Sequence, residues 1–204
     1  MEQGNRTSLF YIIEFLTLAV LIAAVPSIVA LDKEVFLSGS SEVSVTELTQ
    51  EALVLLSAVM FGLGARQRPD SRGWLVLVAG FLTCMLIREA DMWFDMLAKG
   101  FWVYPAVLTA GTAIAYATRH RGNLPSSMAA FAATRASAYI ATGLLIVILF
   151  SRLFGSGSFW QQLVAGSYHP AYKTFIQEGI ELLGYVLLAF GSVCFYLQHC
   201  RPRK

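Results

Sequence analysis

Six apolar stretches, each about as long as a helix that crosses a bilayer, follow one another along this chain of 204 residues. A crossing helix needs about 20 mostly apolar residues. The six stretches cover residues 9–31, 46–65, 73–97, 101–118, 136–155 and 172–198. The sequence therefore predicts an all-α, polytopic membrane protein with one domain, residues 1–204, whose six transmembrane helices form a single bundle.

The composition agrees with this prediction. Hydrophobic residues make up 56% of the chain and charged residues 14%, whereas a soluble domain carries about a quarter charged residues. The net charge of +2 is small and no basic face alternates with aromatic residues, so nucleic acid is not expected as a partner. The three cysteines lie in or beside apolar segments without a CxxC spacing, which favours buried free thiols.

The first stretch resembles a signal peptide only loosely. Residues 27–30 are similar to a cleavage site, but the apolar run is too long and Glu14 interrupts it, whereas a signal core has about 7–15 clean apolar residues. We expect this helix to be retained.

The basic residues predict an orientation. If the N-terminus is cytoplasmic, ten basic residues fall on the inner side: Arg6, Arg66, Arg68, Arg72, Arg119, Arg121, Arg135, Arg201, Arg203 and Lys204. Four fall on the outer side: Lys33, Lys99, Arg152 and Lys173. This positive-inside bias predicts that both termini are cytoplasmic, in a membrane of the bacterial inner (plasma) type.

Three local patterns add detail. Ser44 and Glu47 have capping-box spacing, which predicts a helix that starts near residue 45. The segment 154–170 is too long for a simple turn, and its aromatic residues predict a short interfacial helix over the outer mouth. The small residues of 110–113 favour close packing of the fourth helix.

Acidic residues inside the apolar stretches are the functional lead, because an ionised side chain at mid-membrane costs roughly 2.5–3.5 kcal/mol on insertion scales. At about 1.5 Å per residue, three predicted helices bring acids to one layer in the outer half. These acids are Glu51, Glu89, Asp91, Asp95, Glu178 and Glu181. Polar stripes of this kind should face the interior of the bundle.

The layer predicts a cation site, because facing carboxylates repel unless they are protonated, paired or bound to metal. The candidate ligands are Glu51, Glu89, Glu178, Glu181, Asp95 and His169. A divalent metal ion held by several oxygens would satisfy them, and protonated acids would instead form a proton-coupled pocket. Arg88 and Asp91 have the spacing of a structural ion pair.

Three further titratable residues are expected near the inner surface. Glu14 lies within a turn of that surface and is expected to snorkel, so it is left out of the site. His120 and His199 also lie near the inner face, which gives no support to haem ligation. No pattern indicates a flavin or a nucleotide.

Three functions follow from these residues. The first is a membrane protein whose outward-facing carboxylates bind a metal ion or protons for transport or coupling. The second is a metal-dependent enzyme that acts on a lipid or lipid-linked substrate at the outer leaflet, although HExxH and a nucleophile elbow are missing and no catalytic residue can be named. In general plan the chain is similar to the seven-helix membrane metal hydrolases that act on ceramides, but those sites are rich in histidine and this chain offers at most His169.

The third function is a non-enzymatic assembly or sensor subunit whose acids fix the helix register. The bilayer is the expected partner in every case. A homo-oligomer and other membrane subunits are both left open by the sequence.

Overall fold

The computed structural model describes residues 2–33, 44–163 and 170–201, and these form helices and turns without a strand. The long helices are α1 (Glu2–Leu31), α3 (Val45–Gln67), α4 (Arg72–Glu89), α6 (Val103–Arg119), α8 (Arg135–Leu145) and α11 (Pro170–Phe195). The short elements are η1 (Pro69–Ser71), α5 (Asp91–Asp95), η2 (Arg121–Asn123), α7 (Leu124–Ala132), η3 (Ile146–Phe150), α9 (Ser151–Phe154), α10 (Gly157–Leu163) and η4 (Tyr196–Cys200). Of these, η3 and η4 are π-helical turns that prolong α8 and α11.

Five helical segments of the described chain are long and apolar enough to cross a membrane. They are Leu9–Leu31, Val45–Gln67, Pro69–Glu89, Arg135–Phe154 and Lys173–Cys200. Helix α6, which matches the fourth predicted stretch, has 17 residues and therefore rises about 26 Å. The described chain is thus all-helical with five such segments, and α6 is shorter than each of them.

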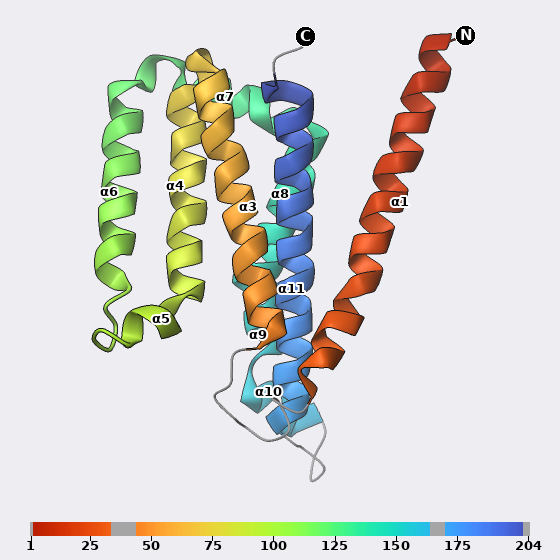
Figure 1. Cartoon of the computed structure of the whole chain (residues 1–204), viewed down its shortest axis with the longest axis vertical. Helices are drawn as coiled ribbons and strands as arrows, with labels where there is room; N and C mark the ends of the chain where they lie inside the picture. The colour runs from red at the N-terminus through yellow and green to blue at the C-terminus, as the bar shows by residue number, and fades with distance from the viewer. Residues whose placement is uncertain (1, 34–43, 164–169, 202–204) are drawn as a thin grey trace.

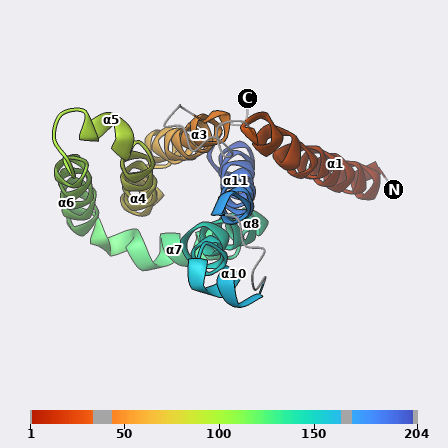
Figure 2. The ribbon, with the colours of Figure 1, turned by 90° about the horizontal axis from the view of Figure 1, so that it is seen from below.

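Helix α11 lies at the centre of the molecule (Figures 1 and 2). Helices α3, α8 and α1 pack against it, α4 packs against α3, and α6 packs against α4. In the membrane-length window of α11, 67% of the residues are buried, compared with 17% in α1. The arrangement is a row that is flanked at one end by α1 and at the other by α6, and most of the surface of α1 is free to face lipid.

Figure 1 also shows that the two chain ends lie at the same end of the bundle. We call this the terminal end: α1 begins there, and α3 and η4 finish there. The opposite end, at which α3 and α11 begin and α4 finishes, we call the acid end.

Glycine brings α8 and α11 into close contact. A Cβ atom added to Gly143 would lie 2.6 Å from the carbonyl oxygen of Gly184, and one added to Gly184 would lie 2.6 Å from Cγ2 of Val147. Gly191 meets Ile140 in the same way, one heptad further along α11. Small residues at helix interfaces let backbones approach closely. This contact fixes the register between the two helices.

The small residues of the fourth predicted stretch also serve packing. An added Cβ atom at Gly80 of α4 would collide with Cβ of Ala113 on α6. Ala113 and Ala117 are the buried residues of α6. The expectation of close packing at 110–113 therefore holds for the contact with α4.

Helix α3 begins where its capping box predicts. Ser44 is the N-cap, and its hydroxyl oxygen accepts from the backbone amide of Glu47 at 3.3 Å. The sequence pattern did not reveal a second cap, the carboxylate of Asp32. Asp32 accepts hydrogen bonds from the amides of Val45 (2.8 Å) and Thr46 (2.7 Å) and from the hydroxyls of Ser44 and Thr46.

Asp32 is buried, and its surroundings act on its pKa in two directions. Burial raises the pKa, but the hydrogen bonds from Thr46, Val45 and Ser44 together outweigh burial, so the pKa lies below the usual value of 3.8. The negative charge also lies at the positive end of the α3 dipole. Asp32 therefore ties the end of α1 to the start of α3 as an ionised group.

At the acid end, one segment differs from its predicted form and another agrees with it. The third stretch was expected to run to residue 97, but α4 ends at Glu89 and the chain turns into the short α5. Asp95 then accepts from the amide of Gly100 at 2.7 Å, and Gly100 has a φ of 79°, which favours glycine. Local hydrogen bonds to the backbone thus replace the last two predicted turns. In 154–170 the structure has the short helix α10, as expected, and residues 164–169 lie outside the described chain.

Candidate functional site

The acid end brings together the carboxylates of Glu89, Glu178 and Glu181, which we call the acid cluster. Glu89 is the last residue of α4, and the other two lie three residues apart on one face of α11. Along α11, Glu178 and Glu181 lie about 12 and 16 Å from Pro170, so they are well inside the helix. The beginning of α3 and the turn around α9 supply the neighbouring polar groups.

Glu89 is held by α11. The hydroxyl of Tyr185 donates to Oε1 of Glu89 at 2.9 Å, and Tyr185 is completely buried. Tyr185 follows Glu181 by four residues, so it extends the same face of α11. This hydrogen bond fixes the end of α4 against the central helix.

Glu178 is held by α3. Nε2 of Gln50 donates to Oε2 of Glu178 at 3.1 Å and also lies 3.3 Å from the carbonyl oxygen of Glu178. Gln50 is 1% exposed. A buried amide in this position has few alternative partners, so the contact links α3 and α11 specifically.

Glu181 is the most enclosed member of the acid cluster, at 5% exposed. Its Oε1 atom accepts from the hydroxyl of Ser151 at 3.0 Å and from Nε2 of Gln177 at 3.1 Å. Nε of Arg152 lies 4.0 Å from the same atom. Ser151 directly follows the π-helical turn η3, and such turns are frequent at functional sites.

The charges of the acid cluster do not balance. Each of the three carboxylates lies within electrostatic range of the other two. Among the described cations, Arg152 alone comes within 4.0 Å of the cluster, and half of its side chain is exposed. Arg88 is also in range of Glu89, but it is bonded to Asp91 at 3.0 Å. The three acids therefore have only the distant Arg152 and the already paired Arg88 in range among the described cations, and otherwise depend on neutral donors.

The other predicted site residues lie apart from this cluster. Glu51 lies beside Glu47 and the side chain of Trp93 on another face of α3. Asp95 is exposed and engaged with Gly100, as described above. Arg88 and Asp91 form the ion pair that their spacing indicates. His169 falls outside the described residues.

A metal site is not apparent in the part of the chain that the structure describes. There, no group of three or more His, Cys, Asp or Glu side chains is arranged to hold a metal ion. Neighbouring hydroxyl and amide groups instead donate hydrogen bonds to the carboxylate oxygens of the acid cluster. An oxygen that accepts such a bond is already partly satisfied. The predicted metal ligands remain a prediction.

The expectation for Glu14 was wrong. This residue does not snorkel to the surface: it is 7% exposed, and its Oε2 atom lies 3.3 Å from Nη1 of Arg135 on α8. The guanidinium of Arg135 also lies over the ring of Tyr11, 4.4 Å from its centroid. The cause is tertiary, because α8 starts beside this turn of α1 and offers a counter-charge that sequence spacing does not show.

Sequence reasoning also missed three partners of the acid cluster, namely Gln50, Ser151 and Arg152. A signal for Gln50 existed: Thr46, Gln50 and Ser57 recur at helical spacing on one face of α3, and all three are buried. No such signal marked Ser151, because the π-helical turn shifts the register of the residues that follow it.

Comparisons of this chain with protein-family models, with curated proteins and with solved structures give no match. The function has to be argued from the site itself.

Proposed function

We propose that this chain is an integral membrane protein whose acid cluster binds a cation, most simply a proton, for transport or coupling across the bilayer. The observation that carries the proposal is the uneven charge of Glu89, Glu178 and Glu181: among the described cations, Arg152 alone lies within 4.0 Å of them, beside Glu181. Buried charges without partners are costly in a medium of low dielectric constant, so a cation is needed to complete the cluster. Chains of acids inside membranes are typical proton carriers.

The hydrogen bonds around the cluster support protons over a hard metal ion. Hydroxyl and amide groups donate to one oxygen of each acid: Tyr185 to Glu89, Gln50 to Glu178, and both Ser151 and Gln177 to Glu181. A carboxyl group that binds a proton needs only one free oxygen. A divalent ion would need several carboxylate or carbonyl oxygens directed at one point.

For the topology, we propose six crossings with the terminal end in the cytoplasm. The chain ends lie on one side of the bundle, which requires an even number of crossings, and α6 supplies the sixth (Figure 1). With 17 residues, α6 has the smallest length that crosses a membrane, which is about 17 residues. Arginines are concentrated at the terminal end, for example Arg66, Arg68 and Arg119, in agreement with the positive-inside rule. The proposed membrane is of the bacterial inner (plasma) type.

The test is proton movement in liposomes that contain the full chain, with a pH-sensitive dye inside. We expect an imposed pH gradient to decay faster with the wild-type protein than with Glu178→Gln or Glu181→Gln. Asp70→Asn is the control, because Asp70 is an exposed acid in η1, at the opposite end of the bundle, and it should behave as the wild type. Equal decay in all four samples and in empty liposomes would contradict transport.

Elemental analysis of the same preparations shows whether the bound cation is a proton or a metal ion. Metal in a one-to-one ratio in the wild type, lost in both Gln variants, would replace the proton by a metal ion and make assays on lipid substrates the next step. No metal, no proton flux and equal stability of the variants would leave the assembly or sensor function.

A further inference from the structure

The backbone of α9 is fastened to the acid cluster on both sides of Arg152. The hydroxyl of Ser151 donates to Glu181 at 3.0 Å, and the amide of Gly155 donates to the carbonyl oxygen of Ser151 at 2.7 Å. A Cβ atom added to Gly155 would collide with the side-chain amide of Gln177, which also donates to Glu181. The base of the Arg152 side chain is therefore held beside the cluster.

The guanidinium of Arg152, in contrast, is held loosely. Its Nε atom lies 4.0 Å from Oε1 of Glu181, which is longer than a hydrogen bond, and the side chain is 51% exposed. A half-exposed ion pair of this kind contributes less than about 1 kcal/mol. Movement of the guanidinium toward the surface would leave the hydrogen bonds from Ser151 and Gln177 to Glu181 in place.

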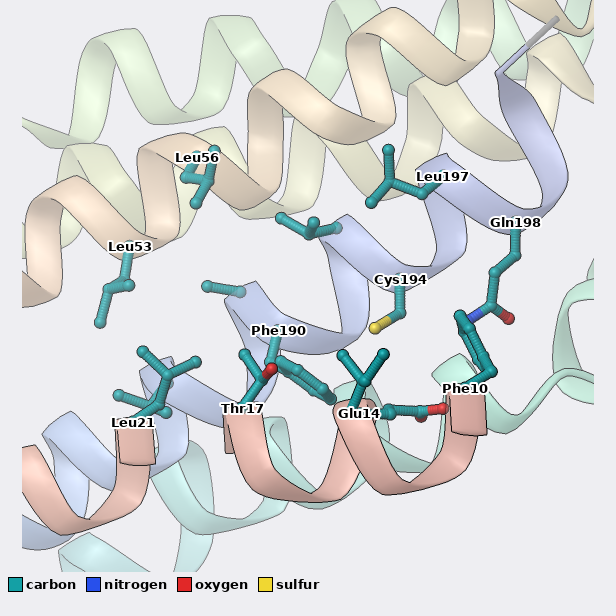
Figure 3. A pocket seen from close by; sticks show the side chains of 14 residues that line it. Phe10, Glu14, Thr17, Leu21, Leu53, Leu56, Phe190, Cys194, Leu197 and Gln198 are labelled. Atoms are coloured by element: carbon teal, nitrogen blue, oxygen red, sulfur yellow. The ribbon is translucent and has the colours of Figure 1, made fainter. Parts of the chain in front are cut away.

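The buried pair near the terminal end shows how a fixed counter-charge is held in this protein. Glu14 lies among mostly apolar side chains in the groove between α1, α3 and α11 (Figure 3). Nη1 of Arg135 donates to it at 3.3 Å, and the same guanidinium lies over the ring of Tyr11. Arg152 has a longer contact with its acid and no hydrogen bond to it at that distance. The contact of Arg152 is therefore the exchangeable one.

The charge of Arg152 acts on more than one member of the cluster. Besides Glu181, it is in electrostatic range of Glu89 and of the hydroxyl of Tyr185. A positive charge beside a carboxyl group favours the ionised form and so competes with a proton for that group. When a proton neutralises Glu181, the attraction that holds the guanidinium is lost.

The other charged groups around the acid cluster are paired, negative, exposed or more distant. The elements that adjoin α9 along the chain, η3 and α10, contain no charged residue. Those of the remaining elements are Arg88, which is bonded to Asp91, Asp32 in the cap of α3, Glu47 and Glu51 of α3, the exposed Lys33, and Lys173, about 12 Å from Glu181 along α11.

We propose that Arg152 sets the proton affinity of the acid cluster. Its guanidinium competes with the proton for Glu181 and moves toward the surface when the proton binds, while Ser151 and Gln177 keep the carboxyl group in place. This inference rests on the proposed proton binding and adds the residue that determines at which pH the cluster becomes protonated.

Infrared difference spectroscopy of the full chain in reconstituted membranes tests the proposal through the midpoint pH of the protonated carboxyl band. In Arg152→Gln, proton binding should be about fivefold tighter, the size of effect of one half-exposed ion pair, so the midpoint should lie about 0.7 pH unit above that of the wild type. Arg152→Lys keeps the positive charge and should have a midpoint close to that of the wild type. A residue with a purely structural role would not move the midpoint.

Lys99→Gln is the matched control, because Lys99 is an exposed cation at the same end, in the turn between α5 and α6, away from α9 and α10 (Figure 1). It should leave the midpoint unchanged, which distinguishes a local contact from a general change of surface charge. A midpoint in Arg152→Gln that is equal to or below that of the wild type would overturn this inference alone. A wild type without a titrating band would overturn it together with the proposed function.

Discussion

Two buried groups of charge lie toward opposite ends of this bundle, and they are balanced differently. Near the terminal end, one acid, Glu14, faces one base, Arg135, at 3.3 Å. At the acid end there are three acids, Glu89, Glu178 and Glu181, and among the described cations Arg152 alone lies within 4.0 Å of them, beside Glu181. The first group is complete and joins α1 to α8. The second group has more acids than nearby cations, and for this reason we propose a function for it and not for the pair.

The largest expected effect comes from removing one charge of the balanced pair. Arg135→Gln leaves the buried Glu14 without its counter-charge, which should lower the free energy of unfolding by about 3 kcal/mol. Arg152→Gln removes a more distant and half-exposed partner and should cost less than about 1 kcal/mol. Reversible unfolding in mixed micelles measures both, with Arg121→Gln as the neutral reference. Equal losses for Arg135 and Arg152 would remove the distinction between the two groups.

The next effect concerns the packed interface that lies between them. Gly184→Ala places a methyl group against Val147 and the carbonyl of Gly143, so the free energy of unfolding should fall by about 2 kcal/mol. Gly62→Ala meets no atom within 4 Å and should instead raise stability by up to about 1 kcal/mol, because alanine is the better helix former. The same unfolding assay reads both. A change of the free energy of unfolding in the same direction for both variants would contradict the close contact of α8 and α11.

A smaller effect should appear at low pH through Asp32, outside the membrane-crossing segments. Its pKa in the folded protein lies below the unfolded value of about 3.8. The stabilisation is therefore fully present above that value and is lost as the pH falls through the folded pKa. Asp32→Ala should cost about 1 kcal/mol at pH 7, as the loss of a helix cap does, and less at a pH below 3.8. Unfolding measured at both pH values checks this, and a cost that does not depend on pH would contradict an ionised cap.

The smallest expected effect distinguishes the acid cluster most clearly from the pair of Glu14 and Arg135. Glu178→Gln removes one of three carboxylates that repel one another, and the oxygen of the new amide can still accept from Gln50. At pH 8 the free energy of unfolding should therefore be unchanged or higher by up to about 1 kcal/mol. Glu14→Gln breaks a one-to-one pair and should lower stability. If the free energy of unfolding rises or stays the same in Glu178→Gln and falls in Glu14→Gln, the carboxylates of the acid cluster repel one another and the pair is structural. A loss in both would make both structural.

The fold was predictable where the sequence of a single helix is enough to define its length or its start. Hydrophobic length located five of the segments that can cross a membrane, and the capping box of Ser44 located the start of α3. The break after Glu89 was not predictable, because the predicted apolar stretch continues to residue 97, whereas the chain turns at Ala90 into the short α5 and Asp95 then accepts from the amide of Gly100. Helical spacing thus defines what a helix could bury, and loop contacts decide where it ends.

The site was predictable in depth but not in its partners. Counting residues from the helix ends brought Glu89, Glu178 and Glu181 to one layer, and the structure places these three in electrostatic range of one another. The same count included Glu51, which faces Trp93, since depth does not specify the direction of a side chain on a packed helix. Ser151 and the pairing of Glu14 with Arg135 depend on contacts between helices far apart in sequence, which no periodicity encodes.

The most direct measurement is infrared difference spectroscopy of the carboxyl groups in reconstituted membranes, recorded while the pH is changed. If the acid cluster binds a proton, the wild type should show a protonated carboxyl band that titrates, and Glu178→Gln or Glu181→Gln should remove or shift it. Glu14→Gln and Asp70→Asn should leave the band in place. A wild-type spectrum without such a band, or one that is identical in the Glu178 and Glu181 variants, would contradict proton binding by the cluster.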